Sequence, residues 1–140
     1  MPSGNAMATT VLLKLAALTG EGRYRDAAEA ALETVTGYLG RYPTGFAQWL
    51  TALDFALAPV REIAIVGGPS SSETAGLLDV ARAGYRPHQV VAVGAAEDSV
   101  VIPLLADRLP IEGRATAYVC RGFACGLPVN DPAGLAAQLT

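Results

Sequence analysis

The residues best suited to chemistry are the two cysteines of this 140-residue chain, Cys120 and Cys125, which form a C-x4-C motif. A redox pair needs two thiols close together and a neighbouring charge that favours the thiolate, and Arg121 could supply that charge. The C-x-x-C spacing of thioredoxin-type catalysis is absent. Cys120 also ends a strand-like run, where a buried cysteine behaves as a small hydrophobe. The motif leaves two alternatives open, a redox pair or a buried structural pair.

A second candidate is the glycine-rich turn between an apolar run and a helix start, made of Gly67, Gly68, Pro69 and Ser70. In open α/β sheets ligands bind at such turns, and the N–H groups of a helix start favour anions. However, Pro69 removes a donor, and the dinucleotide fingerprint and the phosphate-loop lysine are both absent. Ser70 and Glu73 have the spacing of a capping box. We expect capping and turn geometry here, with an anion site at Gly67, Gly68 and Ser70 as the alternative.

The first residues contain a third candidate, Ser3 and Asn5, directly ahead of an apolar helix. Either side chain can cap that helix. The alternative is that both help to line a cavity for a sugar or another small molecule. His88 is the single histidine, and no cluster of Cys or His lies near it in the sequence, so no metal site is predicted. The residues alone assign no catalytic group and imply no cofactor.

Composition limits the possible partners. Apolar residues make up 51% of the chain and charged residues 16%, against roughly 25% charged residues in typical globular proteins. The net charge is −3 and no basic block is present, which argues against nucleic acid and against a membrane surface as partners. Two cysteines are too few for a secreted disulfide scaffold, so a reducing cytoplasm is the expected location. The apolar excess predicts apolar surface kept for a neighbour.

The first part of the chain shows the periodicity of helices. Apolar spacing predicts helices over 5–19, 23–39 and 45–57, with Gly20 as the left-handed stop of the first. Ala58-Pro59 ends the third helix and is the best candidate boundary. We therefore expect two domains, a helical lobe over 1–59 and a small α/β domain over 60–140. The apolar area of the three helices is large, so we expect another surface to cover part of it.

From residue 60 onward the pattern alternates between strand and helix. It predicts strands at 63–66, 89–93 and 115–120, helices at 71–83 and 99–107, and an extended tail at 123–129. Asp131 is the expected N-cap of a last helix, with Pro132 at its first position. Such alternation is typical of an α/β domain, here a three-stranded parallel sheet with helical crossovers.

Two sets of residues carry a family resemblance. The segment Pro2-Ser3-Gly4-Asn5-Ala6, with Leu18-Thr19-Gly20 and Arg23-Tyr24, resembles the last hairpins of α/α-toroid proteins. These include six-hairpin glycosidases and N-acylglucosamine 2-epimerase-like proteins. The segments 61–67, 117–120 and 123–125, with Pro128-Val129 and Asp131-Pro132, resemble the carboxyl end of YyaL-type, spermatogenesis-associated thioredoxin-like proteins.

The resemblance implies a longer parent, with a thioredoxin-like domain, an α/α toroid and a small Rossmann-like α/β appendage. This chain looks like its carboxyl-terminal piece, namely three helices of an incomplete toroid followed by the appendage. The implied role is a non-catalytic structural or interdomain association module. The alternative is part of a carbohydrate-active or small-molecule-active toroid enzyme. Expected partners are the remainder of the parent and, in isolation, further copies of the chain through residues 5–57. The thioredoxin label does not transfer to Cys120 and Cys125.

Overall fold

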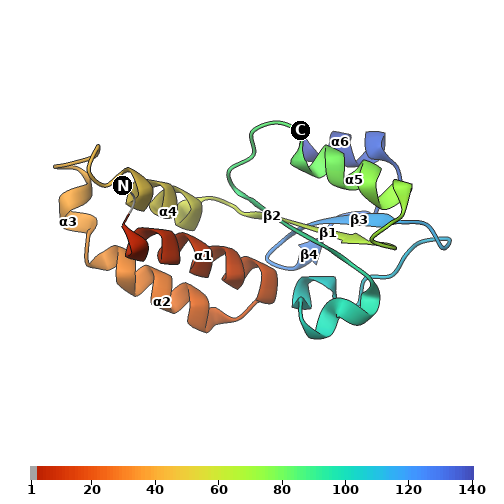
Figure 1. Cartoon of the computed structure of the whole chain (residues 1–140), viewed down its shortest axis with the longest axis horizontal. Coiled ribbons are helices and arrows are strands. Elements are labelled where there is room, and N and C mark those ends of the chain that lie inside the picture. The colour runs from red at the N-terminus through yellow and green to blue at the C-terminus, as the bar shows by residue number, and fades with distance from the viewer. Residues whose placement is uncertain (1–2) are drawn as a thin grey trace. The chain divides into compact units, whose positions relative to one another are not determined.

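The structure is a computed structural model that describes residues 3–140 (Figure 1). Within that range it is mixed α/β, with six α-helices and a four-stranded sheet. The chain divides into two compact units, of which the first ends at Pro59 and the second spans Val60–Thr140. Each unit is described by itself.

The first unit is helical, and its elements are α1 (Gly4–Thr19), α2 (Gly22–Glu33), α3 (Thr36–Leu39) and α4 (Ala47–Leu57). Helix α1 packs against both α2 and α4 (Figure 1). Leu13, Trp49 and Phe55 are among the side chains buried between these helices. The predicted stop of the first helix is confirmed, because Gly20 has a φ of 73° and its N–H donates to the Ala16 carbonyl at 2.8 Å.

The predicted helix over 23–39 is interrupted, because α2 ends at Glu33 and the single turn α3 (Thr36–Leu39) follows only after a turn at Thr34-Val35. The break falls on Thr34-Val35-Thr36, a β-branched run next to Gly37, and these residues have low helix propensity. The Thr34 and Thr36 hydroxyls donate to the Ala31 and Leu32 carbonyls. Such side-chain bonds offer the backbone an alternative to the regular helix.

The second unit has a mixed sheet in the order β2-β1-β3-β4. Its elements in chain order are β1 (Arg61–Val66), α5 (Ser72–Arg82), β2 (Gln89–Gly94), η1 (Ala96–Val100), η2 (Pro103–Leu105), β3 (Thr116–Arg121), β4 (Ala124–Cys125) and α6 (Pro132–Leu139). Strand β1 is parallel to β2, as predicted, and the connection between them is α5. The start of α6 is confirmed, since the Asp131 carboxylate accepts from the Gly134 N–H at 2.8 Å and Pro132 is the first helical residue.

The prediction of a purely parallel sheet is wrong, because β3 runs antiparallel to β1. The segment between β2 and β3 leaves the sheet after Gly94 and returns at Thr116, which pairs with Val66 at the carboxyl end of β1. Gly94 and Thr116 both pair with Val66, so the segment begins and ends at the carboxyl end of β1 and the next strand runs antiparallel to β1. A parallel strand would have needed a connection that returns to the amino end of β1.

The predicted helix over 99–107 is also wrong, because this segment forms the two short 3-10 helices η1 and η2. The β-branched residues Val100, Val101 and Ile102 precede Pro103, and proline cannot continue an α-helix.

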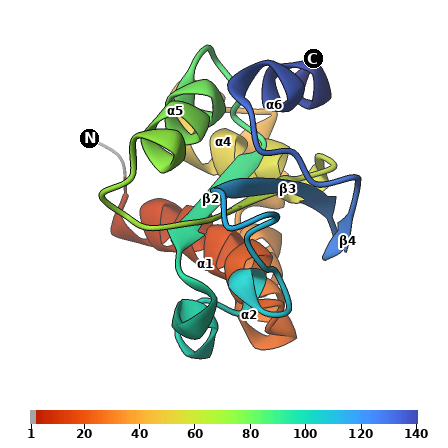
Figure 2. The same cartoon turned by 90° about the vertical axis from the view of Figure 1, so that its right-hand side faces the viewer.

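The sheet is covered differently on its two faces. Helices α5 and α6 lie side by side on one face (Figures 1 and 2), where Ile63, Ile65, Leu77 and Leu135 are almost completely buried. On the other face η2 contacts β1 and β2 through the fully buried Leu104 and Leu105. Full burial of each large aliphatic side chain contributes roughly 1.5–3 kcal/mol, so both layers stabilise the sheet. The η2 face also contains Cys120.

Candidate functional site

Cys120 and Cys125 form a disulfide across the last two strands of the sheet. Cys120 in β3 is paired directly with Cys125 in β4, and their Cα atoms are 3.9 Å apart. The two-residue turn Gly122-Phe123 joins the strands, and Figure 2 shows β4 at the outer edge of the sheet. The predicted extended tail over 123–129 therefore becomes the edge of the sheet, and Val129 exchanges two backbone hydrogen bonds with Ala117.

The two sulfur-bearing residues have different access to solvent. Cys120 is 1% exposed, as expected for a buried cysteine, whereas Cys125 is exposed. The alternative of a wholly buried structural pair is therefore wrong for Cys125. A molecule in solution can reach the disulfide only from the Cys125 side.

The guanidinium of Arg108 lies beside the disulfide. Its Nη2 is 3.0 Å from Cys125 Sγ and 3.5 Å from Cys120 Sγ, and its Nη1 donates to the Ala106 carbonyl at 2.8 Å. Arg108 is only 8% exposed, and its Nε is buried without a hydrogen-bond partner. Burying a charge is costly unless it is paired, so this position is unusual for an arginine.

From its position in the sequence Arg121 could supply this charge, but Arg121 is exposed and Arg108 is the arginine next to the sulfurs. The alternation of a β-strand explains this difference, because residues 120 and 121 of one strand point to opposite faces of the sheet. The available signal was Arg108 itself, which with the adjacent Asp107 interrupts an otherwise apolar stretch between Pro103 and Pro110.

The turn that joins the two cysteines has an unfavourable backbone. Gly122 and Phe123 both have positive φ, 56° and 65°, which is the geometry of a type I′ hairpin turn. Phe123 bears a side chain at a position that favours glycine, and such a conformation costs on the order of 1–2 kcal/mol. The Phe123 N–H donates to the carboxylate of Glu62 at 2.7 Å, and Glu62 is 5% exposed. The disulfide and this buried carboxylate together hold the turn.

An open hollow of about 470 Å³ adjoins Cys125, the exposed cysteine of the pair. Pro103, Asp107, Arg108, Tyr118, Phe123 and Cys125 are among its lining residues. The volume is within the range of small-molecule sites, roughly 300–1,000 Å³. The cysteines, the guanidinium and the hollow thus form one site on the η2 face of the sheet.

The glycine-rich turn is explained by packing and capping. A Cβ on Gly67 would lie 2.6 Å from Thr74 Oγ1 and 2.8 Å from the Ala115 Cβ, so only glycine fits there. The helix cap is Ser71 and not Ser70 as predicted, since the Ser71 hydroxyl accepts from the Glu73 and Thr74 N–H groups. The predicted capping box is therefore wrong. Gly68 and Ser70 are exposed in the turn, and the anion site stays a prediction.

Glu73 joins this turn to the start of β3 in place of its predicted capping role. Its carboxylate accepts from Arg114 Nε at 2.9 Å and from the Ala115 N–H at 3.2 Å. The bond from Arg114, and then the bond from the Ala115 backbone, lower the pKa of Glu73 below its usual value.

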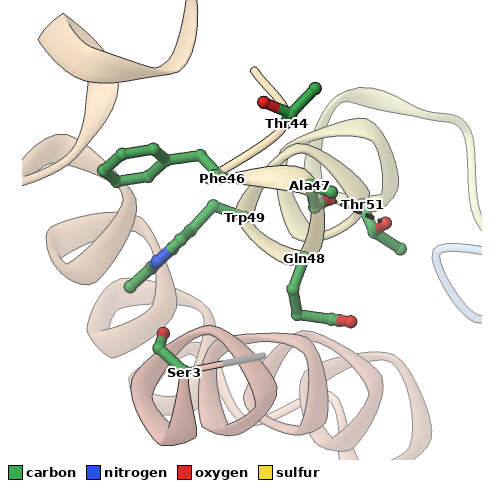
Figure 3. Close-up of a pocket in the computed structure, with 8 residues that line it drawn as sticks. Ser3, Thr44, Phe46, Ala47, Gln48, Trp49 and Thr51 are labelled. Carbon is green, nitrogen blue, oxygen red and sulfur yellow. Dashed lines mark hydrogen bonds between the residues drawn. The ribbon is translucent and has the colours of Figure 1, made fainter. Parts of the chain in front are cut away.

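Ser3 and Asn5 have different surroundings. The Ser3 hydroxyl accepts from the Ala6 N–H at 3.2 Å and caps α1, which confirms the capping interpretation for Ser3. Ser3 also lines a hollow of about 570 Å³ within the first unit, together with residues at the start of α4 (Figure 3). Phe46, Gln48 and Trp49 contribute to that hollow, whereas Asn5 is exposed on α1 and is not one of its lining residues.

Two features are absent from the described range 3–140. None of its helices is long and apolar enough to cross a membrane. Among the same residues no group of three or more His, Cys, Asp or Glu side chains is arranged to hold a metal ion. His88 is half-buried before β2, and its carbonyl accepts from the Arg61 N–H at 2.9 Å.

The chain is similar to spermatogenesis-associated protein 20. It is 28% identical over 138 residues to the proteins of that name from Rattus norvegicus and Homo sapiens, and 27% identical to the one from Mus musculus. The matched region covers 96% of this chain, and the chain spans 18% of the length of these relatives. No protein-family model matches the chain, and no solved structure matches it. The chain is therefore homologous, over nearly all of its length, to a segment of spermatogenesis-associated protein 20.

Proposed function

We propose that this chain acts as a non-catalytic association module of a larger protein related to spermatogenesis-associated protein 20. One observation carries the proposal: the match covers 96% of this chain but 18% of the relative. In this proposal α1, α2 and α4 are the last helices of an α/α toroid. The unit Val60–Thr140 is a Rossmann-like appendage, with β1, α5 and β2 as its parallel part. The remainder of the larger protein, including a thioredoxin-like domain, is the partner.

The exposed side of α1 supports a docking role. Met7 and Val11 lie one helical turn apart and are 50% and 53% exposed. Ala6 and Leu13 are buried on another side of the same helix, so α1 is apolar on more than the side that packs within the unit. A helix that is apolar over so much of its circumference is typical of a position between neighbours on both sides. The occupant we propose is a helix from the remainder of the larger protein, which a second copy replaces when the chain is alone.

The test is a charge inserted into this surface. The double variant Met7→Glu/Val11→Glu places two carboxylates on the exposed side of α1, and Ala27→Glu/Ala30→Glu is the matched control on exposed positions of α2. Analytical ultracentrifugation at tens of micromolar should show self-association of the original chain. The α1 variant should weaken that association about 100-fold, because each buried apolar side chain contributes roughly 1.5–3 kcal/mol. The α2 variant should leave it unchanged.

The remainder of the larger protein, added in trans, should displace the second copy. A chain that stays monomeric and does not bind the remainder would refute the association role. Equal losses in the α1 and α2 variants would show that the exposed side of α1 is not the contact.

A second candidate function rests on the hollow in the first unit, as part of a carbohydrate-active or small-molecule-active enzyme. Trp49 and Phe46 offer ring surfaces there, and Ser3, Gln48 and Thr51 offer polar groups (Figure 3). Pockets for small polar ligands combine such groups. Trp49 is the single tryptophan of the chain, so its fluorescence reports on this hollow. Titration with a panel of neutral monosaccharides should change that fluorescence, and no change up to millimolar sugar would exclude this function.

A further inference from the structure

We propose that the Cys120–Cys125 disulfide exchanges with small thiols, that Cys125 is the sulfur they attack, and that Arg108 stabilises the thiolate released from Cys120. This activity goes beyond an association role and does not depend on it. The chemical class of the substrate is a thiolate, from either a monothiol or a dithiol.

Access decides which sulfur is attacked. An attacking thiolate must approach a disulfide sulfur directly, and only Cys125 is exposed, whereas Cys120 is 1% exposed. The hollow beside Cys125 gives the attacking molecule a place to lie, with Pro103 and Phe123 as apolar walls. Attack on Cys125 makes Cys120 the leaving group.

Arg108 explains how a buried sulfur can leave. A thiolate released at Cys120 would be a buried anion, which is unfavourable without a positive charge nearby. The Arg108 guanidinium already lies 3.5 Å from Cys120 Sγ, and its hydrogen-bond partners among the described residues are the two sulfurs and the Ala106 carbonyl. Reduction therefore gives the buried cation an anionic partner. A leaving thiol that is more acidic also leaves faster.

Glu62 is a second charged residue near the disulfide, because it lies directly opposite Cys120 in the neighbouring strand β1. Its carboxylate accepts the Phe123 N–H and so holds the turn between the cysteines. Phe123 has a positive φ, and strained backbone of this kind gathers at functional sites. Asp107 lines the hollow and is exposed to solvent. Arg108 is thus the cation that contacts the sulfurs, whereas the Glu62 carboxylate binds the turn and Asp107 is exposed to solvent.

The exchange balances as two steps. An external thiolate forms a bond to Cys125 Sγ, the Sγ–Sγ bond breaks, and its electron pair stays on Cys120 as a thiolate. A second external thiolate then attacks the mixed disulfide at the external sulfur and releases Cys125 as a thiolate. The external thiols are oxidised to their disulfide and the Cys120–Cys125 pair is reduced by two electrons.

The experiment mixes the oxidised full chain with excess reduced glutathione or with dithiothreitol, followed by an acid quench and mass spectrometry. Glutathione should be found on Cys125 and not on Cys120, without denaturant. Arg108→Met should slow the exchange on the order of tenfold, because the leaving thiolate loses its cation. Arg121→Met is the matched control: it removes the same charge one residue from Cys120 on an exposed side chain, and it should change the rate less than twofold.

Two further measurements keep the result clear if Arg108→Met folds poorly. Arg108→Lys retains a cation and should recover much of the rate, and the site of glutathione attachment is determined on the unaltered chain. Reaction with dithiothreitol but not with glutathione would support exchange and restrict the substrate to dithiols. A disulfide that resists both reagents until the chain is unfolded would overturn the proposal. Equal exchange rates for Arg108→Met and Arg121→Met would show that Arg108 does not stabilise the thiolate released from Cys120.

Discussion

Replacing Gly67 with alanine tests whether the glycine-rich turn exists for packing. A Cβ at this position would lie 2.6 Å from Thr74 Oγ1, 2.8 Å from the Ala115 Cβ and 3.1 Å from the Ala115 Cα. These separations are shorter than van der Waals contact, and two of the three atoms belong to Ala115, the residue directly before β3. Gly67 also donates its N–H to the Gly94 carbonyl, so the backbone cannot move aside without losing that bond.

The expected cost follows from overpacking a buried site. Forced insertion of one methyl group costs typically 1–3 kcal/mol, so Gly67→Ala should destabilise the second unit by about 2 kcal/mol. For a unit of this size that loss lowers the Tm by roughly 8–16 °C. Gly68→Ala is the matched control, because its Cβ would meet only the Ser71 Cβ, at an ordinary 3.8 Å. We expect it to change the stability by less than about 0.5 kcal/mol.

The assay is urea unfolding followed by far-UV circular dichroism and by tryptophan fluorescence. Trp49 lies in the first unit, so its fluorescence is an internal reference that Gly67→Ala should leave unchanged. Equal destabilisation by the two variants would refute the packing argument. If the turn were instead an anion site, added phosphate would stabilise the original chain and Gly68→Ala would abolish that gain.

Two other predictions concern the same helix start. Thr74→Val should stabilise the second unit by about 1 kcal/mol in urea unfolding. The buried Thr74 hydroxyl has no hydrogen-bond partner, and valine keeps the shape of the side chain. A loss of stability would mean that the hydroxyl is hydrogen-bonded. The bonds to Glu73 lower the pKa of its carboxyl group in the folded state, so their contribution is complete above the ordinary carboxyl pKa and is lost as the pH falls through the lowered pKa. Stability curves between neutral and acidic pH should therefore differ between the original chain and Glu73→Gln, and identical curves would contradict this assignment.

The sequence by itself determined the elements whose signals lie within a few neighbouring residues. The apolar run of β1, the left-handed stop at Gly20 and the Asp131-Pro132 helix start were all predicted, because a strand, a cap and a helix start each depend on adjacent residues. The C-x4-C spacing of Cys120 and Cys125 left a redox pair and a buried structural pair as alternatives, and the disulfide between them is seen only in the fold. The sequence also contains a signal for the break after Glu33, namely a β-branched run beside a glycine. The apolar spacing of a helix continues across this run, so periodicity alone predicts one uninterrupted helix.

Only the tertiary structure decided the direction of β3, the need for glycine at position 67 and the choice of Arg108 over Arg121. The direction of β3 depends on where the segment after Gly94 returns to the sheet, which no local pattern encodes. Gly67 is required because Thr74 and Ala115 approach it from other elements. Arg108 follows η2 in the chain, and its side chain contacts both sulfurs on the η2 face of the sheet. Arg121 is next to Cys120 in sequence, but strand alternation directs its side chain to the other face. Each of these outcomes depends on contacts between residues that are distant in the chain or on the direction of a side chain, and such contacts exist only after folding.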